Sequence, residues 1–234
     1  MEQIILDLKI SNYTYKKEHE HFWKDKNFVI EAVKINGYNI YFASKEFRND
    51  KDVILEAVKN NVFALQYASK ELLDDKEVIM EGVKKCGEML KFASINLRND
   101  REIVFEAIGN NLRSLEYVSD EIKNDRNFFM EAVKFYGCSL FYASDKFKND
   151  KEIVLEAVKN DGKALGYASN KLKNDKDIVY EAVKNCGHAL KFASIDLKDD
   201  NDIVKESVKK DSFNLFYASR RLQCDKAFMI SCKY

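Results

Sequence analysis

The chain has 234 residues, about a third of them charged, and its 39 Lys and Arg balance its 39 Asp and Glu to a formal net charge of zero. Because lysines and acids are interleaved along the chain, the composition lacks the one-sided basic surplus that nucleic acid or an anionic membrane surface requires. The chain has no apolar run of about 18 residues, and its N-terminal apolar stretch is interrupted at Asp7, so neither a membrane span nor a secretory signal is expected.

Residues 1–24 do not follow the pattern of the rest of the chain and are expected to form a divergent N-terminal cap. The apolar residues between Ile4 and Leu8 favour a short helix. His19 and His21 are two residues apart and do not share a helix face. With no third ligand nearby in the sequence, no metal site is expected here.

An aspartate then recurs every 25 residues without slippage and marks the start of a repeated unit. The positions are Asp25, Asp50, Asp75, Asp100, Asp125, Asp150, Asp175, Asp200 and Asp225. A fixed period of roughly 20 to 50 residues is typical of stacked repeat architectures. We therefore expect one elongated domain with eight full repeats, at 25–49, 50–74, 75–99, 100–124, 125–149, 150–174, 175–199 and 200–224.

The first half of each repeat is predicted to be an α-helix, and repeat 150–174 illustrates the reason. Asp150 is a suitable N-cap because its carboxylate accepts hydrogen bonds from unpaired backbone N–H groups. From Ile153 to Val158, apolar residues recur at helical spacing. Gly162 is expected to end the helix in the left-handed conformation. Its equivalents are Gly37, Gly87, Gly137 and Gly187, whereas Val62, Leu112 and Ser212 replace it and predict a local distortion.

The second half of the repeat is shorter, and two structures fit it. One helix could run through Leu165, Ala168 and Leu172, whose spacings of three and four residues place them on one face. Alternatively, a short helix ends at Ser169 and this serine caps a single turn, because Ser favours caps over helix interiors. We favour the second interpretation.

Residues 225–234 begin a ninth helix and are expected to form a C-terminal half-repeat cap. A second period of 100 residues is superimposed on the 25-residue period, since Cys86 and Ile95 recur as Cys186 and Ile195. This 100-residue period indicates that a block of four repeats was duplicated together with its surface.

Polar residues that recur in the repeats are predicted to be structural rather than catalytic. A Glu stands in the middle of each first helix, and in all repeats but one a Lys follows three residues later, a spacing that forms a weak ion pair. Each repeat also carries a Ser, but three His in the whole chain cannot supply a recurring Ser–His arrangement. The sequence has no phosphate-binding loop and no zinc-type ligand pattern. We expect no enzymatic activity, no cofactor and no metal.

Aromatic residues at two variable positions after the first helix are the candidate partner-binding residues. They are Tyr38, Tyr41, Phe63, Phe141, Phe213 and Phe216. Other repeats carry Lys, Glu, Arg or Gln at these positions, and residues three apart on a short helix face the same way. If that face is exposed, the rings form an apolar stripe typical of an interaction surface. Alternatively, they pack under the caps or against neighbouring repeats.

The pattern DKEIVLEAVKNDG followed by ALGYAS and KLKND resembles the repeat of the family named domain of unknown function 4116. The resemblance covers residues 25–224 and weakens at both ends and at Val62, Leu112 and Ser212, which lack the glycine. It implies short helical repeats and brings no catalytic residues with it. Together with the period, it predicts an all-α fold, an α-solenoid of eight 25-residue helix-turn-helix repeats with capping ends.

The function that this architecture favours is a non-enzymatic scaffold or adaptor for protein–protein interaction. The alternative is a structural component of a larger assembly, such as a virion or a cytoskeletal complex. The expected partners are proteins, with no nucleic acid and no membrane. Five scattered cysteines without a CxxC pair fit reduced thiols in the cytoplasm or, alternatively, in a virion or a host cell's cytoplasm.

Overall fold

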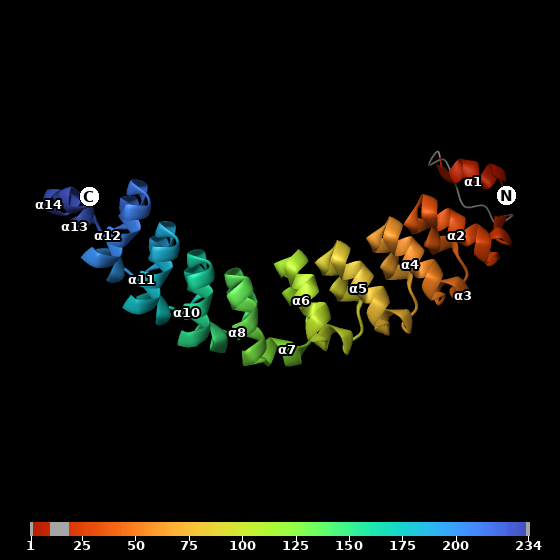
Figure 1. Ribbon diagram of the computed structural model, residues 1–234, viewed down its shortest axis with the longest axis horizontal. Coiled ribbons are helices and arrows are strands. Elements are labelled where there is room, and N and C mark those ends of the chain that lie inside the picture. The colour runs from red at the N-terminus through yellow and green to blue at the C-terminus, as the bar shows by residue number, and fades with distance from the viewer. Residues whose placement is uncertain (1, 10–18, 233–234) are drawn as a thin grey trace. The chain divides into compact units, whose positions relative to one another are not determined.

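The computed structural model describes residues 2–9 and 19–232, and the regular secondary structure of these residues is helical throughout (Figure 1). They form an α-solenoid of short repeats, which confirms the predicted fold class. The chain divides into two compact units, unit 1 (Met1–Ser119) and unit 2 (Asp120–Tyr234), and each is described by itself. The C-terminal half-repeat is described as far as residue 232.

Unit 1 places one α-helix before the repeats and then alternates repeat α-helices with shorter helices, mostly of the 3-10 type. The α-helices are α1 (Glu2–Lys9), α2 (Lys26–Ile35), α3 (Lys45–Arg48), α4 (Lys51–Asn60), α5 (Lys76–Lys85) and α6 (Arg101–Asn110). The 3-10 helices are η2 (Phe22–Lys24), η3 (Gly37–Phe42), η4 (Val62–Tyr67), η5 (Leu72–Asp74), η6 (Gly87–Phe92), η7 (Leu97–Asn99) and η8 (Leu112–Glu116).

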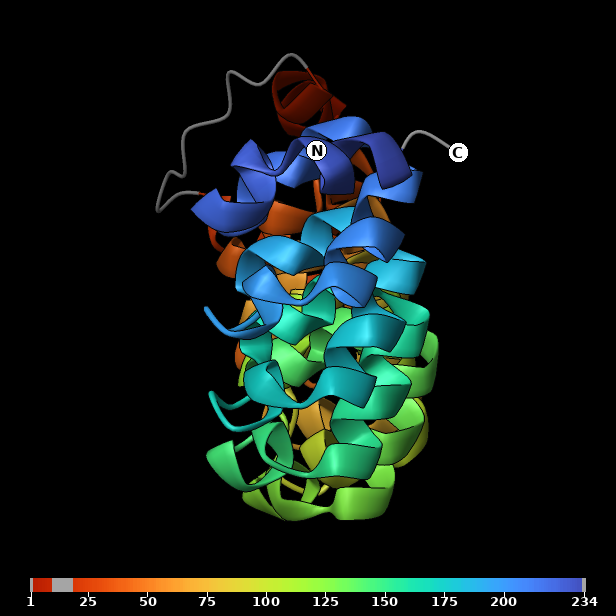
Figure 2. The same ribbon diagram turned by 90° about the vertical axis from the view of Figure 1, so that its left-hand side faces the viewer.

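Unit 2 continues the same alternation, and Figure 2 shows its helices following one another in chain order. The α-helices are α7 (Asp120–Asn124), α8 (Arg126–Phe135), α9 (Asp145–Lys148), α10 (Lys151–Asn160), α11 (Lys176–Asn185), α12 (Asn201–Lys210), α13 (Arg220–Cys224) and α14 (Lys226–Ser231). The 3-10 helices are η9 (Gly137–Tyr142), η10 (Gly162–Tyr167), η11 (Leu172–Asn174), η12 (Gly187–Phe192), η13 (Leu197–Asp199) and η14 (Ser212–Tyr217).

The aspartate of each repeat caps the α-helix that follows it, as the sequence predicts. At α10, Asp150 Oδ1 accepts hydrogen bonds from the backbone N of Glu152 at 3.0 Å and of Ile153 at 3.2 Å. The same cap begins α2, α4, α5, α6, α8, α11, α12 and α14. Because the cap satisfies backbone donors that have no partner inside the helix, it fixes each helix start and maintains the 25-residue register.

The core of each unit is a continuous row of apolar side chains from successive α-helices. The predicted stripe of α10, from Ile153 to Val158, places Ile153, Val154, Ala157 and Val158 fully out of solvent. Helix α10 packs between α8 and α11, so its stripe is covered from both sides. At the start of unit 1, α1 packs on α2 and buries Ile4 and Leu8. The array is therefore held together by contacts between neighbouring repeats.

The repeated glycine does not adopt the left-handed conformation, so that prediction is wrong. Helix α2 instead ends at Ile35, its C-cap Asn36 has an extended backbone with φ −150°, and Gly37 begins η3. A Cβ on Gly37 would lie 2.3 Å from the carbonyl oxygen of Ala57 in the next repeat. The glycine is required because the backbones of adjacent repeats approach too closely at this point for any side chain.

Where the glycine is missing, the α-helices keep their usual length, but the end of α12 is altered, because Ser207 O accepts a hydrogen bond from Asn214 Nδ2 at 3.0 Å and not from the backbone N of Asp211. Helix α4, which precedes Val62, ends at Asn60 in the usual register, and α12, which precedes Ser212, ends at Lys210. The end of α4 is fixed by the backbone hydrogen bond from Asn61 N to Ala57 O at 2.8 Å, which needs no glycine. Helix η8 is shorter, with five residues instead of six.

The second half of the repeat follows the interpretation that we favoured. Helix η10 ends at Tyr167, and Ser169 Oγ then accepts a hydrogen bond from Leu172 N at 3.3 Å. The same serine reaches back to the preceding repeat, because its hydroxyl donates to Asn149 Oδ1 at 2.7 Å and its backbone N to Lys148 O at 2.8 Å. Ser169 is therefore both a cap and a link between repeats, as are Ser69, Ser94, Ser194 and Ser219, whereas Ser44 and Ser144 form no side-chain cap.

Candidate interaction surface

The aromatic residues that the sequence singled out lie on the 3-10 helices that follow the repeat α-helices. Three residues make one turn of a 3-10 helix, so residues three apart are eclipsed. Tyr38 and Tyr41 therefore share one face of η3, while Asn39 and Ile40 between them are buried. We call the positions 13 and 16 residues after each repeat's aspartate the outer positions.

The six candidate rings occupy outer positions, and all six are exposed. The exposed fractions are 39% for Tyr38, 56% for Tyr41, 42% for Phe63, 51% for Phe141, 82% for Phe213 and 78% for Phe216. Core residues of the same helices, such as Leu65 and Leu140, are fully buried. The structure thus brings the six rings to one edge of the repeats within each unit, and none of them belongs to the core.

In unit 1, the outer-position rings pack edge-on against the aromatic residue of the next repeat. The ring centroid of Tyr41 lies 5.4 Å from that of Tyr67 at an interplanar angle of 63° and 5.2 Å from that of Phe42 at 76°. Tyr38 lies 6.4 Å from Tyr67 at 71°. T-shaped aromatic pairs are favourable, so the unit 1 ring cluster (Tyr38, Tyr41, Phe42, Tyr67) is held in position by its own ring contacts.

The same arrangement recurs in unit 2, 100 residues later. Phe141 lies 5.2 Å from Tyr167 at 70° and 4.8 Å from Tyr142 at 89°. We call these three residues the unit 2 ring cluster. The 100-residue period of the sequence therefore corresponds to a duplicated surface. Tyr41, Phe42 and Tyr67 have the same spacing and ring geometry as their counterparts Phe141, Tyr142 and Tyr167.

Sequence reasoning missed the second row of rings in this surface. The position 17 residues after each aspartate is aromatic in every repeat. These residues are Phe42, Tyr67, Phe92, Tyr117, Tyr142, Tyr167, Phe192 and Tyr217. The invariant aromatic character was the signal for an aromatic row beside the outer positions.

Polar side chains between repeats form a ladder of ion pairs that the sequence analysis also missed. In most repeats a Lys or Arg follows the aspartate and reaches the aspartate of the next repeat, as in Lys51 Nζ to Asp75 Oδ2 at 2.8 Å and Lys151 Nζ to Asp175 Oδ2 at 2.7 Å, whereas Asn201 follows Asp200. Arg126 likewise contacts Asp150 at 2.8 Å. For Asp75, partial burial acts to raise the pKa, but hydrogen bonds from Lys51 and from the backbone outweigh it and hold the pKa below its usual value.

The repeated Glu and Lys form the predicted i, i+3 pairs in five repeats, whereas in α5 Glu81 pairs with Lys85 and not with Lys84 as predicted. The Lys Nζ to Glu distance is 2.9 Å for Lys34 and Glu31 and 2.8 Å for Lys59 and Glu56. Lys159, Lys184 and Lys209 pair in the same way with Glu156, Glu181 and Glu206. In α5, Lys85 pairs with Glu81 at 3.3 Å. These carboxylates are thus engaged in structural pairs.

Few side chains in the described part of the chain are suited to bind a metal ion or to act as a nucleophile. Residues 2–9 and 19–232 contain no cluster of three or more His, Cys, Asp or Glu side chains placed to hold a metal ion. The cysteines described are free thiols. Burial, a hydrogen bond to Asp161 and the negative charge of that carboxylate raise the pKa of the Cys138 thiol to about 11. A thiol with so high a pKa is a poor nucleophile near neutral pH.

Fold and surface together define a helical repeat solenoid with an aromatic edge. The chain belongs to the family described as Domain of unknown function (DUF4116), whose model matches residues 8–73, 75–123, 125–173, 150–198 and 175–223. Searches of curated proteins and of solved structures found no match to this chain. Within residues 2–9 and 19–232, no helix is long and apolar enough to cross a membrane.

Proposed function

We propose that this protein is a non-enzymatic scaffold or adaptor that binds other proteins through the 3-10 edge of its repeats. By this edge we mean the side of the repeats on which the outer positions of the 3-10 helices lie. The observation that carries the proposal is the exposure of aromatic rings on that edge in both units. Tyr41 is 56% exposed and Phe141 51%, although each is held by neighbouring rings. Large exposed rings at fixed positions are typical of the central contacts of protein interfaces.

The polar groups of the repeats support a binding role over a catalytic one. In repeat 150–174, Ser169, Glu156 and Asp150 are each engaged in hydrogen bonds or ion pairs that stabilise the stack. Aromatic side chains, by contrast, lose little conformational entropy on binding because two torsion angles define them. We place the protein in the cytoplasm, where its free cysteines stay reduced.

Affinity capture with a surface variant tests the proposal. In the ring variant, Tyr41, Phe141, Phe213 and Phe216 are changed to Ser, and we expect it to keep the helical circular dichroism, with a melting temperature lowered only by the loss of the ring contacts of Tyr41 and Phe141. Proteins captured from the native cell by the wild type should be lost from this variant. Ile95→Ser with Ile195→Ser is the matched control, because both side chains are exposed and lie outside the outer positions.

The two outcomes separate the proposal from its alternative. Loss of the captured proteins in the folded ring variant, together with their retention in the isoleucine control, supports the proposed edge. Retention in both variants contradicts it and favours a structural component that contacts its neighbours through other faces.

A further inference from the structure

We propose that Asn36 is a deamidation site that the folded array keeps unreactive, because Asn60 in the next repeat holds the backbone nitrogen of Gly37 that would attack it. Asn36 and Gly37 form the one Asn-Gly pair in the sequence. A glycine after an asparagine favours this reaction, because its backbone N approaches the asparagine side chain without hindrance from a Cβ. The inference does not depend on the proposed function, and the co-reactant is water.

The reaction converts the side-chain amide of Asn36 into a carboxylate in two steps. Gly37 N first loses its proton to hydroxide and forms a bond to Asn36 Cγ, while the bond from Cγ to Nδ2 breaks and ammonia leaves with a proton from water. Water then opens the resulting five-membered succinimide ring. Opening at Cγ gives aspartate, whereas opening at the backbone carbonyl carbon gives isoaspartate, whose chain runs through the side chain. Asparagine and water thus become ammonia and one of these two acids, with no change of oxidation state.

The side chain of Asn36 is arranged in favour of this attack. It is exposed at the C-cap of α2, so water reaches it. Its Oδ1 accepts a hydrogen bond from Tyr38 N at 3.0 Å. Negative charge develops on this oxygen when Gly37 N attacks Cγ, and a backbone N–H that already points at the oxygen stabilises that charge. The hydrogen bond that caps η3 therefore also promotes deamidation.

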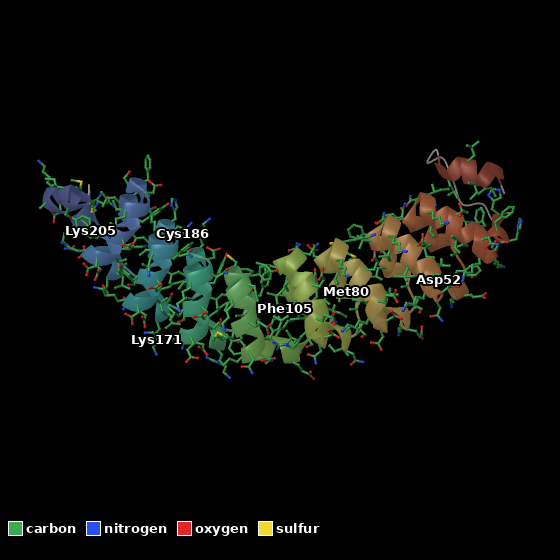
Figure 3. All side chains as sticks on the ribbon, in the orientation of Figure 1. Asp52, Met80, Phe105, Lys171, Cys186 and Lys205 are labelled. Carbon is green, nitrogen blue, oxygen red and sulfur yellow. The ribbon has the colours of Figure 1, made fainter. Side chains whose placement is uncertain are left out.

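The attacking nitrogen, by contrast, is engaged and buried. Helix α4, on which Figure 3 labels Asp52, carries Asn60 at its C-terminal end. Gly37 N donates a hydrogen bond to Asn60 Oδ1 at 2.8 Å, and Asn60 Nδ2 donates to Lys34 O at 2.8 Å, so this amide is fixed at both ends. Gly37 itself is buried, which keeps hydroxide from its N–H. The reaction therefore requires a local opening of the junction between α2 and α4.

The two products differ in whether they fit this junction. Asp161 stands at the equivalent position of repeat 150–174 and caps η10, because its Oδ1 accepts a hydrogen bond from Lys163 N at 2.9 Å. An aspartate at position 36 would keep the cap in the same way. Isoaspartate inserts a methylene into the backbone before Gly37, where a single Cβ would already lie 2.3 Å from Ala57 O. Isoaspartate therefore forces repeats 25–49 and 50–74 apart.

Incubation of the full chain at mildly alkaline pH tests the inference. Peptide mass mapping at intervals gives the deamidated fraction at Asn36, and electron-transfer fragmentation separates aspartate from isoaspartate. The same chain in guanidinium chloride supplies the rate without the fold. The test variant is Asn60→Ala, and all native rates are taken at a temperature at which circular dichroism shows each variant to be folded.

Two further variants serve as controls. Asn160→Ala removes the same pair of hydrogen bonds in unit 2, at Gly137, which follows Tyr136 and not an asparagine. It reports how far a general loss of stability alone accelerates the reaction at Asn36. Asn60→Asp keeps an oxygen acceptor for the backbone N–H of the attacking glycine and loses only the amide donor.

We expect Asn36 of the folded wild type to deamidate at least about tenfold more slowly than in guanidinium chloride, and Asn60→Ala to raise the native rate about tenfold. Asn160→Ala and Asn60→Asp should react at the wild-type rate. Equal rates in the folded and unfolded wild type would show that the fold gives no protection. An unchanged rate in Asn60→Ala, or an equal acceleration in Asn160→Ala, would show that the hydrogen bond from Gly37 to Asn60 is not the cause of protection. Each of these results would overturn the inference.

Discussion

Asn160 spans the junction between two repeats and holds the backbone at Gly137. Its Oδ1 accepts a hydrogen bond from Gly137 N at 2.8 Å, and its Nδ2 donates to Lys134 O at 2.8 Å. The same two bonds join Asn60 to Gly37 and Lys34, and Asn110 to Gly87 and Lys84. One amide side chain thus satisfies a donor and an acceptor left unpaired where the preceding α-helix ends.

The close approach at this junction predicts that Gly137→Ala is destabilising. A Cβ would lie 2.5 Å from Ala157 O, so the two repeats must move apart, and we expect a loss of about 1 to 3 kcal/mol in the free energy of unfolding. Urea unfolding followed by circular dichroism measures it. Gly109→Ala is the control, because Gly109 is exposed within α6 and alanine there should stabilise by about 0.5–1 kcal/mol. Equal effects of the two changes would contradict the close-approach explanation.

The two hydrogen bonds of Asn160, which we call the brace, predict that Asn160→Ala is also destabilising. The change leaves Gly137 N and Lys134 O without their partner, and we expect about 1 to 3 kcal/mol of destabilisation. Asn127→Ala serves as the comparison, because Asn127 is exposed at the start of α8 and its side chain makes no hydrogen bond within the described residues. Hydrogen exchange at Gly137 reports the effect locally, and unchanged protection of that amide would rule out the brace.

The fold was largely predictable from the sequence because its determinants are local and repeated. The aspartate caps, the apolar stripe from Ile153 to Val158 and the serine cap each depend on residues within one repeat. The role of the glycine was not predictable from one repeat, because it depends on Ala57 O or Ala157 O in the next repeat. The sequence did contain one indication of this role. Where Val62 replaces the glycine, Lys85 stands in place of the bracing Asn, and Lys85 Nζ instead donates to Lys59 O at 2.6 Å.

The ion-pair ladder predicts a pH-dependent effect of Arg126→Gln. The hydrogen bond from Arg126 is the largest contribution that holds the pKa of Asp150 below its usual value of 3.8. The unfolded chain therefore binds this proton more readily than the folded chain, so the pair stabilises the fold above about pH 4 and the stabilisation is lost as pH falls through the lowered pKa. The melting temperature of the variant should lie below that of the wild type at pH 7 and converge with it in acid.

Arg220→Gln provides the comparison for that experiment, because Arg220 is exposed and forms no ion pair within the described residues. It should leave the melting temperature unchanged at both pH values. A difference between the Arg126 variant and the wild type that persists or grows in acid would contradict the assignment of the stabilisation to the Asp150 carboxylate.

The raised pKa of Cys138 predicts slow modification of this thiol. A pKa of about 11 instead of 9.0 leaves about a hundredfold less thiolate at pH 8, so Cys138 should react with iodoacetamide much more slowly than the exposed Cys224. Asp161→Asn should speed the reaction of Cys138, because it removes the charge while an asparagine can still cap the helix, as Asn36 does. Peptide mass mapping gives the rates, and equal rates for Cys138 and Cys224 would contradict the expected pKa.

The candidate surface was predictable in part. Tyr41 and Phe141 stood out because charged residues replace them in other repeats, and their exposure follows from the three-residue turn of the 3-10 helix. Tyr67 and Tyr167 did not stand out, since a residue type that never varies resembles a core position in a single sequence. Their packing on Tyr41 and Phe141 joins adjacent repeats, and contacts of this kind follow from the stacking geometry.

Site-specific photo-crosslinking in the native cell is the most direct test of the aromatic edge as the binding surface. A benzophenone amino acid would replace Phe141 or Phe216 on the edge, Lys171 at the opposite edge of unit 2 (Figure 3), or Tyr180, which is exposed on α11. We expect the same partner protein to be crosslinked from Phe141 and Phe216 and not from Lys171 or Tyr180. Crosslinks that form from Lys171 or Tyr180 and not from Phe141 or Phe216 would show that the protein binds its partners through another face.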